Sequence, residues 1–314
     1  MASFEWSFDA PTGTFKQNAL SKKLYQAAVE DTTFMDHVKP ISSFGRKQGE
    51  NVTLTRIANL TEPTSAVLTE GVRIPEDDFS VTTTSITVSE IGRSVPYTSL
   101  AEDLSFFDVE NQIQRVLRDQ MKLSLDSIAA VAFTAGQVKY VPTGLASATV
   151  TTNGTAGAAA AANMNLWHVE EIRDYLYDTI RVPQIGNDYV AIFRTLGLRG
   201  IKRDPAWEEW FKYTNPSQKF NSEVGRLEGI RFIETNHNNA LQKVGTNSVL
   251  GEGVVFGEDA VALAEVLTPE LRAAIPGDFG RAKAVAWYGI LQAGQIWGDS
   301  GSAGEARVLH VTST

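Results

Sequence analysis

DVENQIQRVLRDQMKLSLDSIAAVAFTAG, residues 108–136, is the most regular segment of the chain. Asp108 is a suitable N-cap, Gly136 supplies a stop signal, and the pattern between them predicts one helix over residues 108–135. At about 1.5 Å per residue this helix is roughly 40 Å long, enough to span a whole flat domain. Its apolar stripe has the helical spacing of three and four and consists of Val109, Ile113, Val116, Leu117, Met121, Leu125, Ile128 and Ala132. Its polar face carries Arg115, Arg118, Asp119, Lys122 and Asp126.

Two segments before this helix are dense in β-branched residues. ENVTLTRI (50–57) and SVTTTSITVSEI (80–91) partly alternate in polarity, so we predict two strands. Their connection, residues 58–79, is unusually long for a compact domain, and such loops tend to be functional. We therefore predict a hairpin that projects onto a neighbouring subunit, the alternative being a solvated surface hairpin. The connection sets a single Arg73 against the acidic residues Glu62, Glu70, Glu76, Asp77 and Asp78.

The N-terminal segment is aromatic and interrupted by proline and glycine. This composition is typical of an extended arm, and exposed aromatic side chains on an arm need another surface to cover them. Residues 18–38 follow with a helical apolar spacing. We expect the arm to be an assembly element that contacts other subunits through Phe4, Trp6, Phe8 and Phe15.

The rest of the chain is a mixed region of helix and strand patterns followed by strands. The low-complexity residues 147–163 predict a flexible loop, and Asn165 is placed to cap a helix that ends at Pro183. A further helix or helix pair is predicted over 195–213. Strands are predicted at 188–193, 229–235 and 253–257, then at 284–297 and 305–314, with the last two joined by a turn at 298–304. Because strands and helices are segregated, the fold class is α+β.

Composition excludes several classes of protein. The chain of 314 residues is 43% hydrophobic and 21% charged, as in ordinary globular proteins, and it has no cysteine for disulfides or thiolate chemistry. Its net charge of −9 disfavours a strong grip on nucleic acid and leaves room only for a loose, hydrated contact. Neither a signal peptide nor a membrane helix is predicted.

No catalytic, cofactor or metal site is predicted. The four histidines, at 37, 168, 237 and 310, have no metal-ligand spacing and are expected at surface or packing positions. GEGVVFG (251–257) has its third glycine one place too late for a dinucleotide site. Gly298-Asp299-Ser300-Gly301 matches the serine environment of some proteases, but no histidine motif accompanies it, so we predict a turn.

Four segments carry a resemblance to a known family: GRSVPYTSLAEDLS (92–105), GIRFIETNH (229–237), FGRAKAVAWYGILQAGQIWG (279–298) and EARVLHVTS (305–313). Their order and spacing resemble those of the major capsid proteins of tailed bacteriophages, more narrowly the N4-like podovirus branch. The resemblance implies the Hong Kong-type capsid fold. It assigns residues 1–48 to an N-terminal arm, 49–97 to an extended loop, 98–139 to a peripheral domain with a spine helix, 140–267 to an axial domain and 268–314 to peripheral strands.

The resemblance also implies partners. Many copies of the chain would form hexamers and pentamers of an icosahedral virion shell around double-stranded DNA, assembled in the host bacterial cytoplasm. Only about fifty residues precede the extended loop, so a separate scaffolding protein is expected, besides a portal protein, and a decoration protein is an open option. The acidic connection is expected to meet Arg115, Arg118 and Lys122 of a neighbour, unless both sets are simply solvated.

Two other functions remain open at this point. A shell subunit of a bacterial nanocompartment would resemble the same fold but enclose an enzyme instead of a genome. A soluble enzyme with an unrecognised site is the other alternative, and the absence of clustered histidines, of cysteine and of a nucleotide loop counts against it.

Overall fold

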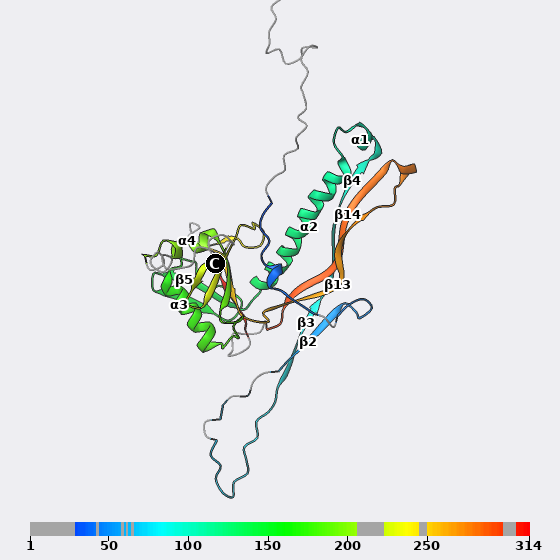
Figure 1. Cartoon of the computed structure of the whole chain (residues 1–314). Helices are drawn as coiled ribbons and strands as arrows, with labels where there is room; N and C mark the ends of the chain where they lie inside the picture. The colour runs from blue at the N-terminus through cyan, green and yellow to red at the C-terminus, as the bar shows by residue number, and fades with distance from the viewer. Residues whose placement is uncertain are drawn as a thin grey trace, which may run out of the picture.

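The computed structural model describes residues 29–41, 44–57, 60, 62–63, 66–205, 223–244, 250–297 and 306–314. They form two lobes and a projecting hairpin (Figure 1). The α+β class predicted from the sequence is confirmed. No helix in this described part of the chain is long and apolar enough to span a membrane.

The first lobe is a four-stranded sheet with one long helix along it. The strand order is β1 (Lys39–Pro40), β13 (Val261–Ala273), β14 (Ala282–Gln295) and β4 (Ser89–Thr98). Helix α2 (Val109–Thr134) packs on this sheet, and the short α1 (Ser99–Leu104) lies at its far end (Figure 1). We call this unit the four-stranded lobe.

Helix α2 confirms the strongest sequence prediction, because its capping and its apolar stripe agree. The Oδ1 atom of Asp108 accepts a hydrogen bond from the backbone N–H of Asn111 at 3.0 Å. Leu117 is buried against Val285 and Trp287 of β14. Two side-chain expectations are wrong: Asp126, expected to decorate the polar face, is completely buried, and Val116, expected in the apolar stripe, is 60% exposed.

The second lobe is a mixed seven-stranded sheet flanked by helices α3 (Leu166–Asp174) and α4 (Thr195–Lys202). A five-residue π-helix, Tyr175–Thr179, extends α3. This second lobe also contains a two-stranded sheet of β10 (Lys243–Val244) and β11 (Leu250–Gly251). We call this unit the seven-stranded lobe, and its strand order is β6 (Ser147–Thr151), β5 (Val138–Gly144), β15 (Val308–Val311), β12 (Gly253–Phe256), β7 (Tyr189–Arg194), β9 (Ile230–Thr235) and β8 (Glu223–Leu227).

The hairpin consists of β2 (Asn51–Ile57) and β3 (Val81–Thr87), which pair antiparallel along their whole length. It projects from the side of the four-stranded lobe, and the connection between its strands lies farthest from the rest of the chain (Figure 1). The predicted second strand, 80–91, is divided at Val88: its first part pairs with β2, and its last part is the start of β4.

The two lobes meet at a shared apolar core, which we call the seam cluster. The C-terminal end of α2 enters this cluster, so the same helix serves both lobes. Burying such side chains is worth about 1.5–3 kcal/mol each. Its fully buried members include Phe34, Ala129, Ala130, Phe133, Ile192, Leu241, Val254, Phe256, Val261 and Leu291.

Several sequence predictions were wrong. Residues 305–314 do not return along β14, because β15 lies in the other sheet between β12 and β5. The expected flexible loop 147–163 begins with strand β6, and the helix expected over 18–38 appears in the described residues 29–38 only as the single turn Met35–His37.

Two boundaries also need redrawing. The boundary expected at 267/268 falls inside β13, and residues 89–97 of the expected extended loop belong to β4. Residues 206–222 and 298–305, which include the second part of the helix expected at 195–213 and the Gly-Asp-Ser-Gly turn, lie outside the described residues.

Candidate assembly surfaces

The base of the hairpin is packed firmly on the four-stranded lobe. Val52 and Ile86 are buried against Ala262 and Ala264 of β13. Gly294 of β14 permits this close approach, since a Cβ atom there would lie only 2.8 Å from Cγ1 of Ile86. The hairpin is therefore seated by its own strands before it leaves the body of the molecule.

Two arginines fix the same junction from the other side. The guanidinium of Arg56, a buried residue of β2, lies 5.8 Å from the ring centre of Trp297, and that of Arg307 lies 4.5 Å from it. Cations over an indole face are attracted by its quadrupole. Trp297 lies two residues after the end of β14, and Arg307 directly precedes β15. This stack consequently joins the hairpin to the place where the two lobes meet.

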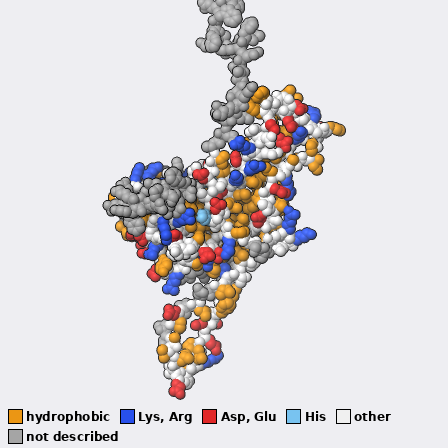
Figure 2. All heavy atoms as spheres, viewed as in Figure 1, with side chains coloured by type: hydrophobic (Ala, Val, Ile, Leu, Met, Phe, Trp, Pro, Cys, Tyr) orange, Lys and Arg blue, Asp and Glu red, His pale blue; other side chains and the backbone are white. Residues whose placement is uncertain are grey.

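The far end of the hairpin is different, because its apolar side chains are exposed. Phe79 has 64% of its surface exposed and Ile74 likewise 64%. An apolar cluster of this kind, mixed with charges, marks a surface that another molecule covers. Figure 2 shows hydrophobic and acidic side chains together at this end, and the exposed apolar residues described there are Ile57, Leu60, Val67, Leu68, Val72, Ile74, Phe79 and Val81.

The predicted acidic residues all lie on this surface. Glu62, Glu70, Glu76, Asp77 and Asp78 are exposed. Glu76 forms an ion pair with Arg73 within the connection, both side chains being largely exposed. An exposed pair of this type contributes about 0–1 kcal/mol. The connection thus keeps most of its negative charge for a partner or for solvent.

The predicted basic partners lie elsewhere. Arg115, Arg118 and Lys122 are exposed on α2. In Figure 1 that part of α2 lies on the opposite side of the molecule from the end of the hairpin. The structure of one chain does not bring the two sets together, so any contact between them has to join two copies. The arm residues Phe4, Trp6, Phe8 and Phe15 lie outside the described residues.

A second exposed apolar surface was not predicted. It lies at the end of the four-stranded lobe, where α1 meets the turn between β13 and β14, and the backbone N–H of Ser99 donates to the carbonyl of Arg281 at 3.0 Å. The aromatic pair Phe106-Phe107 after α1 was the available sequence signal. The exposed members are Leu100, Leu104, Phe106, Ile275 and Phe279.

Comparison with known proteins decides the family. The model of the phage capsid family matches residues 13–185, more than half of the chain. This chain belongs to the phage capsid family. It is a structural protein, a major capsid protein that forms the head shell, and a nanocompartment role is not favoured by these matches. No curated protein matches the chain.

Solved phage capsids show the same fold as this capsid protein at low sequence identity. The capsid of Helicobacter pylori bacteriophage KHP30 aligns with a TM-score of 0.73 at 11% identity, over 98% of each chain. The capsid of cyanophage Pam1 gives 0.68 at 15% identity, over 100% of this chain and 99% of that one. The capsid of Ralstonia phage GP4 gives 0.63 at 14%, over 99% and 97%. The expected Hong Kong-type capsid fold is confirmed, whereas the N4-like branch stays a prediction.

The histidines of the capsid protein occupy packed positions. His168 is buried, with Nε2 2.9 Å from the carbonyl of Gly144 and Nδ1 2.9 Å from the hydroxyl of Tyr140. Burial lowers the pKa of His168 and raises that of Tyr140, so both groups are neutral and Nδ1 of the imidazole accepts a hydrogen bond from the Tyr140 hydroxyl. This pair joins α3 to β5 inside the seven-stranded lobe.

A second buried network joins three segments through His310. Its Nδ1 lies 2.7 Å from Nζ of Lys139, and its Nε2 lies 2.5 Å from Oε1 of Glu252. Burial lowers the pKa of His310 and of Lys139. Burial opposes the ionisation of Glu252, but the hydrogen bonds from His310 and the backbone N–H of Gln242, together with nearby positive charge, outweigh it and leave the pKa of Glu252 below its usual range. A neutral imidazole between an ammonium and a carboxylate satisfies all three groups.

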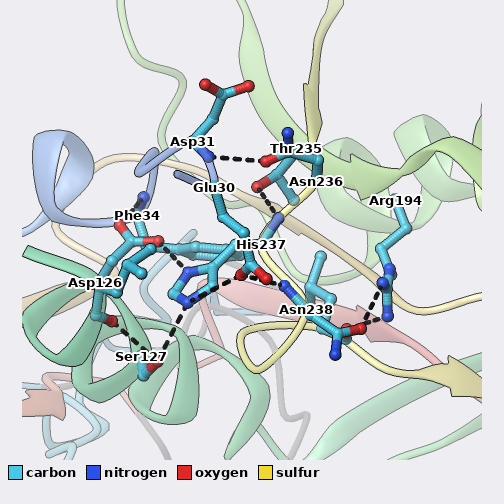
Figure 3. Close-up of polar contacts among 12 residues, drawn as sticks. Glu30, Asp31, Phe34, Asp126, Ser127, Arg194, Thr235, Asn236, His237 and Asn238 are labelled. Atoms are coloured by element: carbon cyan, nitrogen blue, oxygen red, sulfur yellow. Dashed lines mark hydrogen bonds and ion pairs between the residues drawn. The ribbon is translucent and has the colours of Figure 1, made fainter. Parts of the chain in front are cut away.

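In a third network a serine, a histidine and an aspartate contact one another in the order found in hydrolase triads. Nε2 of His237 lies 3.3 Å from Oγ of Ser127, and its Nδ1 lies 2.8 Å from Oδ2 of Asp126 (Figure 3). The Ser127 hydroxyl also donates to the carbonyl of Leu123 at 2.9 Å. The side chains of His237 and Asp126 are 1% and 0% exposed, so a substrate has no access to them. Within the described part of the chain, no group of three or more His, Asp or Glu side chains is placed to hold a metal ion.

Proposed function

We propose that the capsid protein assembles mainly through its hairpin, with the connection 58–79 lying on a neighbouring subunit. The observation that carries this proposal is the set of exposed apolar side chains on the described part of the connection, of which Leu68, Ile74 and Phe79 are examples. Each gains about 1.5–3 kcal/mol when it is fully buried. Repeated through every copy, such contacts add up to the large interfaces of obligate assemblies.

The shell proposed here is icosahedral, built of hexamers and pentamers, and encloses double-stranded DNA in the virion. In it the seven-stranded lobe is the axial domain at the capsomer centre, and the four-stranded lobe is the peripheral domain. With a net charge of −9, the inner surface touches DNA only loosely. Assembly in the host cytoplasm would use separate scaffolding and portal proteins, and a decoration protein remains an option.

Electrostatics would set the register of this contact. The acidic connection, with Glu76 and Asp77 at its exposed end, would face Arg115, Arg118 and Lys122 of a neighbour. Each exposed pair is weak and screened by salt. Like charges facing each other penalise wrong pairings, however, and that penalty repeats at every contact of the lattice.

A charge-reversal experiment tests this pairing. Arg115→Glu with Arg118→Glu should reduce particle yield at low salt, and Glu76→Lys with Asp77→Lys in the same chain should restore it. Particles are counted by electron microscopy after purification. Unchanged yield from the reversal, or no rescue by the second pair, would show that the hairpin is held by backbone and apolar contacts instead.

The N-terminal arm is proposed as a second assembly element. Its aromatic residues Phe4, Trp6, Phe8 and Phe15 would be covered by other subunits. Deleting residues 2–15 should leave a folded subunit, measured by circular dichroism, that assembles poorly. A normal particle yield from this deletion would remove the arm from the proposal.

A further inference from the structure

Residues 30–41, which we call the strap, cross the boundary between the two lobes. One end is fixed to the four-stranded lobe, because β1 pairs with β13 in register Lys39 to Ala262 and Pro40 to Leu263. Beyond it, the backbone N–H of Ile41 donates to the carbonyl of Leu263 at 3.0 Å. The strap thus ends as an added strand of the four-stranded sheet.

The other end is fixed to the seven-stranded lobe. The backbone N–H of Asp31 donates to Oδ1 of Asn236 at 2.7 Å, and Oε2 of Glu30 accepts from the backbone N–H of Asn238 at 2.8 Å (Figure 3). Asn236 and Asn238 are the first and third residues after β9. Oδ1 of Asn238 in turn accepts from Arg194, at the end of β7, at 3.0 Å.

The middle of the strap is held by a buried carboxylate on α2. Oδ1 of Asp126 accepts from the backbone N–H groups of Phe34 at 2.7 Å and Met35 at 3.2 Å. Oδ2 of the same residue lies 2.8 Å from Nδ1 of His237, in the loop after β9. The Phe34 ring beside these bonds is fully buried in the seam cluster, 5.8 Å from the ring of Phe133. One carboxylate therefore joins the strap, α2 and the seven-stranded lobe.

These hydrogen bonds fix the orientation of one lobe against the other, which the seam cluster cannot do alone. Apolar burial is non-directional, so a cluster of side chains tolerates small rotations of one lobe against the other. Hydrogen bonds weaken steeply when their angle changes. A set of them with one end on each lobe consequently selects one orientation.

We propose that the strap sets the angle between the two lobes, and that Asp126 is its positioning residue. This inference rests on the proposed function for its significance, because a shell of hexamers and pentamers places identical chains in positions of different curvature. A chain whose lobe angle is held within narrow limits enters the lattice with one defined shape. A chain without the strap contacts enters the lattice with a range of lobe angles and therefore with many shapes.

The arrangement of the lobes can be followed through a distance between two labels. Because the chain has no cysteine, two introduced cysteines are the only labelling sites. Ser94→Cys on β4 and Glu170→Cys on α3 are exposed positions, one in each lobe. Spin labels on both report the distance between the lobes in the unassembled, full-length subunit by double electron–electron resonance. The unaltered strap should give one narrow distance distribution.

Two variants test the strap from its surface and from its centre. Glu30→Ala with Asn236→Ala removes the outer contacts, including the 3.8 Å approach of Glu30 Oε2 to Nε2 of the buried His237, and truncates no side chain of the seam cluster. Asp126→Asn removes the buried charge. Both should broaden or shift the distance distribution, and the first should do so with an almost unchanged free energy of unfolding. Asp119→Asn, on the same helix, is the matched control and should leave the distribution as it was.

The proposal is overturned if the surface variant folds normally and keeps the narrow distribution of the unaltered chain. That variant decides the matter alone if Asp126→Asn fails to fold. Because the measurement uses unassembled subunits, its outcome is independent of shell formation. If the unaltered chain formed no shell while the strap variants broadened the distribution, the proposed function would fail and the strap would stand. If the unaltered chain assembled while the surface variant kept the narrow distribution, the strap would fail and the proposed function would stand.

Discussion

The strap and the connection of the hairpin are both largely irregular segments, yet they treat their apolar side chains in opposite ways. Phe34 of the strap is 0% exposed, whereas Phe79 of the connection is 64% exposed. The strap also places backbone N–H groups on acceptors of its own chain, Asp126 and Asn236. The strap is thus completed within one subunit, while the connection presents a surface that needs a second one.

This difference separates two quantities that are easily confused in a shell protein. The buried contacts of the strap should govern the free energy of unfolding of the single subunit. Contacts of the connection should govern assembly and leave that free energy almost unchanged. The following experiments test this separation.

The largest effect is expected in the connection. Leu68→Ser with Ile74→Ser should abolish particle formation, because it removes apolar surface that a neighbour would bury. The free energy of unfolding of the subunit should stay within about 0.5 kcal/mol, as for other surface changes. Electron microscopy and urea unfolding measure the two. Leu145→Ser, exposed on the other lobe, is the matched control, and normal particles from the double variant would contradict the assignment.

The next effect belongs to the strap. Phe34→Ala should lower the free energy of unfolding by about 3–5 kcal/mol, since it leaves a cavity in the seam cluster. Phe79→Ala removes the same group from an exposed position and should change that free energy by less than about 0.5 kcal/mol. Urea unfolding of both unassembled variants gives the contrast. Equal effects would mean that the strap does not stabilise the subunit.

A smaller effect is expected at the junction between body and hairpin. Gly294→Ala places a Cβ atom 2.8 Å from Cγ1 of Ile86, and overpacking of this kind costs about 1–3 kcal/mol. Ile86→Val keeps Cγ1 but removes the Cδ1 atom, which lies 3.0 Å from the same position. It should therefore recover part of the loss, so the two changes should not add. A double-mutant cycle by urea unfolding tests this, and strict additivity would show that the two side chains do not meet.

The smallest effect is a dependence of stability on pH. Burial lowers the pKa of His168 and His310 below the usual 6.5, so the unfolded chain binds their protons more readily. The stability that comes from burying the two neutral histidines is fully present above pH 6.5. It is lost as the pH falls toward the lowered pKa values. Each tenfold preference of the unfolded chain for such a proton costs the folded state about 1.4 kcal/mol. Unfolding in urea at pH 7 and pH 5 measures it. His310→Gln should reduce the change in the free energy of unfolding between the two pH values. A free energy of unfolding that does not depend on pH would contradict the burial of these two histidines.

The parts of the fold that follow from local pattern were predicted from the sequence. Helix α2 was expected over 108–135 and spans Val109–Thr134, because one apolar stripe and a capping aspartate agree. The hairpin strands were found because β-branched residues dominate them. Strand β13 was missed: its charged residues and Pro269 weaken the strand pattern, and its long pairing with β14 stabilises it.

The features that could not be predicted depend on contacts with residues that are distant in sequence. All four residues of β15 are buried, which requires cover on both faces, but nothing in VLHV shows which sheet supplies it. Asp126 was placed on the polar face of α2, because a helical pattern alone cannot show that a strap and His237 cover that face. The acidic and basic assembly candidates were found as exposed residues, and their pairing between copies stays a prediction.

The short spacing between β3 and β4 has a mechanical consequence. Only Val88 separates them, and its N–H donates to the carbonyl of Glu50 at 2.9 Å, so the chain runs from the hairpin straight into the sheet beside β14 (Figure 1). The ladder between β4 and β14 extends from Ser89 to Thr98, with its hydrogen bonds perpendicular to the strands. Tension on the hairpin therefore loads this ladder in shear, where all its bonds must yield together, and not in peeling, where they would yield one at a time.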